Sequence, residues 1–360
     1  MRFALTAEAV KALLTESVQQ AKQGVRGANP VVGAVIADAA GNLIAAGHHR
    51  GAGTAHAEVD ALQNLIAWLE GSEGSIDPRT LTMFVTLEPC NHTGRTGPCS
   101  KAILDAGIGR VVFAVADATD QASGGAAFLA EHGVEVIDGA TVSEAWVAEA
   151  KALNARWFAA QREGRPFTTL HLAQTLDANI AAIDGTSQWI TGDMSLHHSH
   201  EIRSCVDAIV VGTGTIFADN PQLTARDAQG ELFAHQPLRV AMGQREVPET
   251  ARIRGEGTFL QVKTHDPREV LDQLKQRGVS HVLIEGGSSV ATAFLKADLV
   301  DEIWLYQAPK FLGQGRSALD DLGITTLNKA IQFELDEVDG PAVRQSGPDV
   351  LIHLTKTAEK

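Results

Sequence analysis

The sequence predicts an α/β protein built from two domains. Its 360 residues exceed what one ordinary hydrophobic core organises, so two domains are expected. Segments with strand character alternate with segments of helical periodicity in both halves, which is typical of sheets covered by helices. Hydrophobic residues make up 44% of the chain and charged residues 21%, which is the balance of a globular protein.

The first half opens with a helix followed by two strands. Thr6 suits the N-cap of the helix. Residues 29–38 then predict a strand, residues 39–42 a turn and residues 43–49 a second strand. The helix is indicated by apolar residues that share one face, which are Val10, Leu13, Leu14, Val18 and Ala21.

Helices and strands continue to alternate as far as residue 138, so a sheet with helices on both faces is expected. One helix begins near His56, and one buried strand ends at Pro89. In chain order the predicted elements are a helix over 56–70, a strand over 80–90, a helix over 100–107, a strand over 110–117, a helix over 125–133 and a strand over 134–138.

A helix over residues 143–161 is predicted to link the two domains. It ends at the polar sequence "REGRP", where an ordered core element is not expected. We place the domain boundary inside this helix, which gives domains of residues 1–148 and 149–360.

The second half repeats the alternation with different turns. Residues 206–221 predict a strand that runs into a glycine turn. The other predicted elements are a strand over 167–177, a helix over 192–205, a helix over 267–278, a strand over 279–287, a helix over 288–297 and a strand over 300–311.

Charge and cysteine content exclude several classes of protein. The net charge of −14 disfavours a nucleic-acid partner, because such binding depends mainly on neutralising phosphates. No apolar run reaches the ~18 residues of a membrane span, and the N-terminus lacks the pattern of a signal peptide. Three cysteines are too few for a secreted disulfide scaffold, so a cytoplasmic protein is expected.

Four residues of the first half form a pattern typical of a catalytic zinc site. His56 and Glu58 open a predicted helix, Cys90 ends a strand, and Cys99 precedes a short helix. One imidazole and two thiolates leave a fourth zinc position open for water, and zinc lowers the pKa of that water to about 7. Glu58 is then placed to move a proton. The order H-x-E, then P-C and a second cysteine, matches a zinc-deaminase signature with a lengthened spacer.

Other interpretations of the same residues remain open at this point. An H-x-E triplet also occurs on ordinary amphipathic helices, and a P-C pair can simply end a strand. Cys90 and Cys99 could form a disulfide, although a reducing compartment disfavours it. A zinc-stabilised binding module would need a fourth protein ligand, and none is evident near the cysteines.

The segments "HAEVDAL" and "TLEPCNHTGRTGPC" resemble the bifunctional riboflavin-biosynthesis deaminase–reductase family. This resemblance implies a cytidine-deaminase-like three-layer α/β/α first domain that binds zinc through His56, Cys90 and Cys99. It implies that the inserted loop belongs to the substrate pocket. The substrate would be a diaminopyrimidinone bearing ribose 5-phosphate, contacted by Asn29, His49, His92 and Arg95.

Two glycine turns follow strands of the second half, and neither is a G-x-G-x-x-G fingerprint. The segments "SQWITG", "VGTGTIFADNPQLTAR", "LIEGGSSV", "YQAPKFLG" and "GPDVLIHL" resemble, in order, the reductase domain of the same family. The resemblance implies a dihydrofolate-reductase-like α/β fold that uses NADPH to reduce the ribosyl group to a ribityl chain. It implies cofactor contacts at Ala173, Trp189, Thr215, Asp219, Gly287, Ser288 and Ser289. It implies substrate contacts at Ser187, Arg203, Leu223, Arg226 and Glu285.

The reductase segments depart from the family pattern at four positions. His171 stands where the family has lysine, Thr175 where it has serine, and Ala178 where it has glycine. Gly243 replaces an aspartate. An alternative function is therefore a nucleobase or nucleoside zinc deaminase whose second domain does not catalyse. We nevertheless expect an active reductase, and a homo-oligomer, either a dimer or a tetramer.

The sequence "HHSHEIRSC" is given no metal role. His197 and His200 share a helix face, but no carboxylate or cysteine stands at ligand spacing to complete a site. A solvated helix face is expected there, and Cys205 is expected to be a small buried residue.

Overall fold

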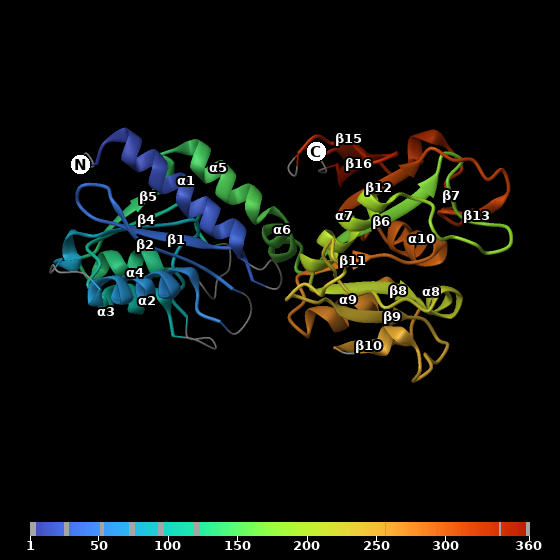
Figure 1. Ribbon diagram of the computed structural model, residues 1–360, viewed down its shortest axis with the longest axis horizontal. Coiled ribbons are helices and arrows are strands. Elements are labelled where there is room, and N and C mark those ends of the chain that lie inside the picture. The colour runs from blue at the N-terminus through green and yellow to red at the C-terminus, as the bar shows by residue number, and fades with distance from the viewer. Residues whose placement is uncertain are drawn as a thin grey trace. The chain divides into compact units, whose positions relative to one another are not determined.

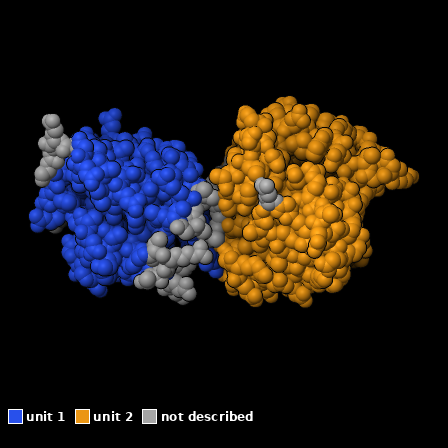
Figure 2. Space-filling view, turned by 60° about the horizontal axis from the view of Figure 1, so that its bottom comes forward, with its two compact units in different colours: residues 1–161 blue, residues 162–360 orange. Residues whose placement is uncertain are grey.

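The computed structural model describes residues 5–24, 29–50, 54–71, 76–92, 97–117, 123–255, 257–337 and 340–357. The chain forms two compact units, residues 1–161 and 162–360 (Figure 2). This division lies later in the chain than the predicted boundary between residues 148 and 149. Each unit has its own hydrophobic core.

The first unit is a three-layer α/β/α structure around a five-stranded sheet of order β2-β1-β3-β4-β5. β1 pairs antiparallel with β2 and β3, while β3, β4 and β5 are parallel. Figure 1 shows α1 and α5 along one face of the sheet and α2, α3 and α4 along the other. The strands are β1 (Gly33–Ala37), β2 (Leu43–His48), β3 (Thr82–Val85), β4 (Arg110–Phe113) and β5 (Glu135–Asp138). The helices are α1 (Ala7–Gln23), α2 (Ala57–Glu70), α3 (Cys99–Asp105), α4 (Gly125–Glu131) and α5 (Glu144–Leu153).

Local sequence accounts for where these elements begin. Thr6 caps α1 as predicted, because its side chain accepts a hydrogen bond from the backbone N–H of Ala9 at 3.2 Å. The strands are shorter than predicted. β3 ends at Val85, so Pro89 and Cys90 lie on the connection that follows it.

The predicted linking helix is two helices, α5 and α6 (Ala155–Glu163). Asn154 separates them, and its buried side chain pairs with the backbone of Val31. Val31 N–H donates to Asn154 Oδ1 at 2.8 Å, and Asn154 Nδ2 donates to Val31 C=O at 2.9 Å. An asparagine whose amide satisfies a distant backbone is a tertiary feature that helical periodicity does not reveal.

The second unit is built on a nine-stranded sheet whose main path is β10-β9-β8-β11-β6-β12-β16-β14. The strands from β10 to β12 along this path are parallel, and β14, β15 and β16 add antiparallel pairs. The strands are β6 (Phe167–Thr175), β8 (Ala208–Gly212), β9 (Leu238–Met242), β10 (Phe259–Val262), β11 (His281–Ile284), β12 (Glu302–Ala308), β14 (Phe333–Leu335), β15 (Val343–Ser346) and β16 (Asp349–Lys356). A separate pair joins β7 (Asn179–Ala182) to β13 (Gly315–Ser317). The helices are α7 (Asp193–Ser204), α8 (Thr213–Asp219), α9 (Pro267–Lys275) and α10 (Ser288–Lys296).

Both faces of the central parallel strands are buried. Val210 and Ile284 pack with Leu271 of α9 and Phe294 of α10 on one side. Their sequence neighbours Ile209 and Leu283 belong to a second apolar cluster, which includes Ile216 of α8. This is the pattern of a parallel sheet covered on both faces, whose strands have continuous apolar sequences.

Two predictions for the second half are wrong. The glycine turn expected after β8 is the helix α8, because residues 213–219 form a short helical turn after the strand. Cys205 is half-buried rather than buried, since it ends α7 at a helix C-cap. Strands β7, β9, β10 and β13 to β16 were not predicted. All except β16 have three to five residues, which leaves little periodicity to recognise. The eight-residue β16 alternates buried and more exposed positions and was overlooked.

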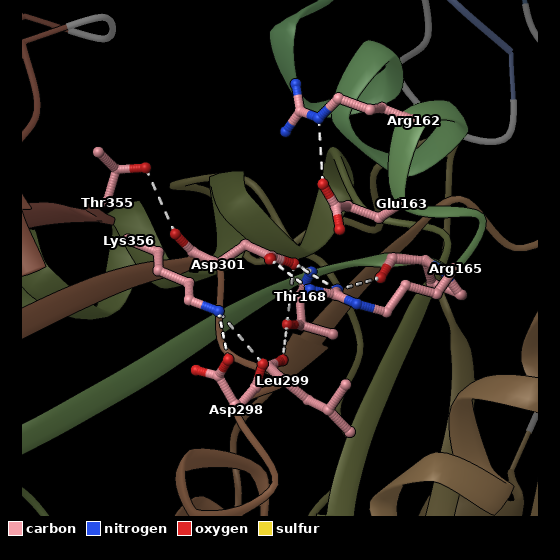
Figure 3. A network of polar contacts seen from close by, with 10 residues as sticks. Arg162, Glu163, Arg165, Thr168, Asp298, Leu299, Asp301, Thr355 and Lys356 are labelled. Carbon is pink, nitrogen blue, oxygen red and sulfur yellow. Dashed lines mark hydrogen bonds and ion pairs between the residues drawn. The ribbon is translucent and has the colours of Figure 1, made fainter. Parts of the chain in front are cut away.

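A polar network fixes the start of β6 at the beginning of the second unit (Figure 3). Arg165 makes two hydrogen bonds to the carboxylate of Asp301, at 2.7 and 2.6 Å. The backbone N–H of Thr168 donates to the same carboxylate at 2.8 Å. Nearby, Lys356 pairs with Asp298 at 2.7 Å. Bidentate arginine–carboxylate pairs are directional, so this network holds β6 in register next to β12.

Within the part of the chain that the structure describes, no helix combines the length and apolarity that a membrane crossing requires.

Candidate active sites

In the first unit, three residues predicted as metal ligands come together. His56 is the N-cap of α2, Cys90 lies on the connection after β3, and Cys99 is the first residue of α3. His56 Nδ1 lies 3.6 Å from Cys90 Sγ and 3.3 Å from Cys99 Sγ. Among the described residues, these three form the one group of ligating side chains with all donor atoms within 4.8 Å of each other.

The separations of the donor atoms fit a zinc ion. Bonds of about 2.3 Å to sulfur and 2.0 Å to nitrogen, arranged tetrahedrally, place sulfur and nitrogen about 3.5 Å apart. The measured 3.6 and 3.3 Å agree with that value. Both cysteines are free thiols, so the disulfide alternative is wrong.

The electrostatics of this cluster favour metal binding. The hydrogen bond from the Cys99 side chain, reinforced by His56, lowers the pKa of Cys90 to about 4. The same contact with Cys90, together with burial, raises the pKa of Cys99 well above its usual value. Two thiols that share one proton in this way present a thiolate for a dication to bind.

Glu58 lies in the first turn of α2 and is buried beside the two cysteines. Burial raises the pKa of Glu58 to about 7, and the Cys90 thiolate adds to this effect. A carboxyl that is uncharged part of the time at neutral pH can both accept and donate a proton. The position therefore suits a proton shuttle next to the metal ligands.

Two predicted substrate residues are linked to the same cluster. Asn29 Nδ2 lies 3.0 Å from His49 Nε2, and His49 Nδ1 donates to the Ala55 carbonyl at 3.1 Å. The His49 ring packs edge-on against His56, with ring centroids 5.3 Å apart. Asn29 therefore acts as the donor to a neutral His49, whose pKa is lowered by burial.

The inserted loop is only partly described. His92 has a buried Nδ1 with no hydrogen-bond partner among the described residues, and a ligand atom could satisfy it. Arg95 lies outside the described residues. Its predicted contact with substrate stays a prediction.

Sequence reasoning missed one residue that positions this loop. The Glu88 carboxylate accepts hydrogen bonds from the backbone N–H groups of Asp117, Gly124 and Ala126 at 3.1 to 3.2 Å. It thereby ties the segment that carries Cys90 to the start of α4. A buried acid within "LEPC" was the available signal.

In the second unit, the carboxyl ends of β8 and β11 form a topological switch point. The chain leaves β8 towards β9 on one side, and leaves β11 towards β12 on the other. Ligands of open α/β sheets bind in the crevice at such a point. Helix α8 follows Gly212, the last residue of β8, and residues 285–287 connect β11 to α10. Helix α8, this connection and the start of α10 contain most of the predicted cofactor residues.

The close approach of the β8–α8 junction and the β11–α10 connection depends on glycine. A Cβ at Gly286 would lie 2.7 Å from Val211 Cα, and one at Gly287 would lie 3.2 Å from Thr215 Oγ1. Gly287 also has a φ of +45° at the N-cap of α10. The first amides of α10 lack helical partners and suit an anionic cofactor group.

The remaining cofactor residues are more dispersed. Ser289 donates to Asp320 Oδ2 at 2.7 Å, and Ser288 is buried. Asp219 ends α8. Ala173 lies on β6 opposite Tyr306, and Trp189 is 63% exposed.

Predicted substrate residues of the second unit form a buried charge cluster. Arg203 Nε and Nη2 donate to the two carboxylate oxygens of Glu285 at 2.7 and 2.6 Å. Arg203 Nη1 donates to the Thr224 carbonyl at 3.2 Å. Burial works against ionisation of Glu285, but Arg203 more than offsets it, so the pKa of Glu285 is lowered.

Other predicted substrate residues are held by local contacts. Arg226 donates to Thr224 Oγ1 and to the Gly230 carbonyl, at 3.1 and 2.7 Å. The Leu223 side chain packs in an apolar cluster, so a substrate contact through that side chain is not supported. Ser187 is half-buried.

The helix "HHSHEIR" is less solvated than expected. His197 faces Glu201 at 3.3 Å, whereas His200 Nδ1 lies 3.0 Å from the Thr224 carbonyl oxygen and 3.2 Å from the Arg226 backbone nitrogen. Burial and the charge of Arg203 lower the pKa of His200, so His200 belongs to the charge cluster around Arg203. His171, on β6, adds to the cluster, with Nε2 2.8 Å from Ser199 Oγ.

Two family models match the chain. The cytidine and deoxycytidylate deaminase zinc-binding region matches residues 7–115. The RibD C-terminal domain matches residues 166–343.

Curated relatives match along most of the chain. The riboflavin biosynthesis protein RibD of Mycobacterium tuberculosis (strain H37Rv) is 40% identical over 326 residues, which cover 90% of each chain. RibD of Escherichia coli (strain K12) is 33% identical over 362 residues, which cover 91% of this chain and 93% of the relative.

Solved structures agree with these matches. Acinetobacter baumannii RibD superposes with a TM-score of 0.82 at 30% identity, covering 98% of this chain and all of that one. A Thermotoga maritima diaminohydroxyphosphoribosylaminopyrimidine deaminase/5-amino-6-(5-phosphoribosylamino)uracil reductase superposes with a TM-score of 0.81 at 29% identity, covering 98% and 99%.

Proposed function

The chain belongs to the RibD family of bifunctional riboflavin-biosynthesis enzymes, and on that premise we propose the residues and the substrate for its two reactions. The protein is a zinc-dependent deaminase and an NADPH-dependent reductase. The proposed substrate is 2,5-diamino-6-ribosylamino-4(3H)-pyrimidinone 5′-phosphate. Its exocyclic amine is removed first, and its ribosyl group is then reduced to a ribityl chain.

The arrangement of His56, Cys90 and Cys99 beside a buried Glu58 carries the deaminase assignment. These three ligands would hold a zinc ion, which would act as a Lewis acid and make water a nucleophile at neutral pH. Glu58 takes the proton of the attacking water and delivers it to the departing amine. Asn29 and His49 orient the pyrimidine ring, and His92 and Arg95 contact it from the inserted loop.

In the second unit, bound NADPH would supply the hydride, and the protein supplies binding and orientation. The first amides of α10, with Gly287 and Thr215, bind the cofactor, and Asp219, Ala173, Trp189, Ser288 and Ser289 surround it. Arg203 retains free N–H donors beyond those used by Glu285 and Thr224. With Arg226 and Ser187, Arg203 binds the substrate phosphate in this proposal, because a phosphate suits planar guanidinium groups.

The thiols of the zinc site are free, so we propose a reducing, cytoplasmic location for the enzyme. A homo-oligomer stays a prediction that a sedimentation measurement tests.

One preparation tests both activities. Zinc content, ammonia release from the diaminopyrimidinone, and loss of NADPH absorbance after the first product is added are measured in turn. Both reactions are expected, and Glu58→Gln should slow the first by about 10²–10⁴-fold while leaving the second intact when deaminated substrate is supplied. Ammonia release without any NADPH oxidation would favour the alternative, a deaminase whose second domain does not catalyse.

A further inference from the structure

One arginine near the cofactor loops has no role in the function described so far. Arg245 lies just beyond the carboxyl end of β9, the strand next to β8. Its guanidinium stacks over the Phe217 ring of α8, with 4.5 Å between the guanidinium carbon and the ring centroid. The stack fixes the position of the group but uses none of its N–H donors.

The charge of Arg245 is not neutralised in the described part of the chain. No carboxylate there lies within ion-pair distance of it, although the protein is acidic overall. The adjacent acid, Glu246, forms an ion pair with Lys263 instead. An exposed guanidinium that is held in place and left without an acid is suited to a ligand anion.

Arg245 reaches the first turn of α8, the same turn that approaches α10. A Cβ on Gly214 would lie 3.5 Å from Arg245 Nη2, and a Cβ on Gly287 would lie 3.2 Å from Thr215 Oγ1. The start of α8 therefore has the N-terminus of α10 on one side and Arg245 on the other.

Strand pairing sets the distance between these two positions. Gly212 pairs with Met242 in the register of β8 and β9, and a Cβ on Gly286 would lie 3.0 Å from Gly212 N. Neighbouring strands are ~4.8 Å apart, so the loops after β11 and β9 are separated by about 10 Å. That is within the span of the adenosine half of a nicotinamide dinucleotide whose pyrophosphate lies at α10.

The end of β9 packs closely against the start of α8. Gly243 has a φ of +138°, and a Cβ there would lie 2.5 Å from Thr213 Oγ1. A side chain at this position would clash with Thr213, so glycine allows the segment that carries Arg245 to approach α8.

We propose that Arg245 binds the 2′-phosphate of NADPH and so sets the preference of the reductase for NADPH over NADH. The inference rests on the proposed reductase function. It adds a specificity residue at the adenosine end of the cofactor. A phosphate monoester dianion meets a planar guanidinium with paired donors, and NADH has only a neutral hydroxyl at that place.

The test measures dissociation constants of the full-length protein for NADPH, NADH, 2′,5′-ADP and 5′-AMP by titration calorimetry. Arg245→Gln should weaken the binding of NADPH and 2′,5′-ADP by about 10- to 100-fold, because one charged hydrogen-bonding partner is removed. NADH and 5′-AMP should bind as before. Arg245→Lys keeps the charge but not the paired donors. Its affinity for NADPH and 2′,5′-ADP should lie between those of the unchanged protein and Arg245→Gln.

Arg277→Gln is the matched control. It removes the same charge from an exposed arginine that follows α9, towards the amino end of β11. This variant should bind all four ligands like the unchanged protein. Unfolding curves of the variants should coincide, since both arginines are exposed.

Failure of the Arg245 assignment and failure of the proposed reductase function give different results. If Arg245→Gln weakens NADPH and NADH equally, or changes neither, the assignment of the 2′-phosphate to Arg245 is wrong. If Arg316→Gln, which alters the cation that faces Asp219, removes the selectivity instead, the assignment is also wrong. If the unchanged protein binds none of the four ligands, the proposed reductase function itself fails.

Discussion

Arg203 and Glu285 form a bidentate ion pair, with two N–H···O bonds of 2.7 and 2.6 Å in the interior of the second unit. The side chains are 17% and 8% exposed, so the pair is largely shielded from water. Both residues were predicted to contact the substrate. The structure shows that the two side chains also neutralise each other's charge.

Removing one partner of this pair should destabilise the second unit strongly. Glu285→Ala leaves a buried guanidinium without its acid, and a loss of about 3–5 kcal/mol in the free energy of unfolding is expected. Urea denaturation measures it. The double variant Arg203→Met/Glu285→Leu removes both charges and should lose much less. Equal losses in the two variants would show that packing, not charge, is responsible.

The same pair gives a pH dependence. The folded-state pKa of Glu285 is lowered, since Arg203 outweighs burial, so its contribution to stability is complete above the unfolded value near 4.5. That contribution is lost as the pH falls below 4.5 through the folded-state pKa. Comparing urea midpoints of the unchanged protein and the double variant between pH 7 and pH 3 measures it. Parallel pH profiles would contradict the assignment.

Variants of Glu58 and variants of the two cysteines should differ in zinc content, although both lose deaminase activity. Glu58→Gln keeps the three ligands, so about one zinc per chain should remain while deamination falls by about 10²–10⁴-fold. Cys90→Ser or Cys99→Ser should lose both zinc and activity. Elemental analysis and ammonia release give the two readouts. Loss of zinc from Glu58→Gln would instead make this residue part of the metal site.

His171 is expected to support reduction as a neutral hydrogen-bonding group. Burial lowers the pKa of His171. Glu285 raises this pKa and Arg203 lowers it, so these two charges oppose each other. The His171 ring also packs against Tyr306. The reduction rate should therefore show no titration of this group above pH 7. His171→Ala should slow the step, and His171→Lys should change it little. A rate that falls through the histidine range and flattens in His171→Lys would show that His171 acts through its charge.

Ala178 should be replaceable by glycine with a gain in stability. It is an exposed turn residue with a φ of +59°, a left-handed conformation that costs an L side chain about 1–2 kcal/mol. Glycine removes this strain but makes the unfolded chain more flexible, which offsets part of the gain. Ala178→Gly should therefore stabilise the unit by about 0.5–1 kcal/mol. Gly185→Ala is the mirror control, because Gly185 has a φ of +90° and open space around its Cβ. It should destabilise, and the same sign for both variants would refute the argument.

The fragment that ends at residue 161 should be more stable than the one that ends at residue 148. The shorter fragment loses Asn154, whose amide makes two hydrogen bonds to Val31, and the buried Ala150. A difference of about 2–3 kcal/mol is expected from the two unpaired backbone groups that remain. Urea unfolding and zinc content compare them. Equal stability would favour the boundary predicted from the sequence.

The sequence alone determined the fold class, the zinc ligands and most element positions. Periodicity located α1, α2, α9 and α10, because their buried faces follow the helical repeat in the sequence itself. His56, Glu58, Cys90 and Cys99 could be identified because zinc chemistry restricts the residue types and places them at element ends. These are properties of short segments, so they can be read without a structure.

Tertiary structure alone decided the features that depend on distant partners. Asn154 ends α5 because Val31 lies next to it, and Arg203 is neutralised because β11 brings Glu285 to α7. The position of Arg245 follows from the pairing of β9 with β8, which places two separate loops at one edge of the sheet. Neither the partner nor the distance is encoded near the residue in sequence, because strand order is set by the packing of the whole unit.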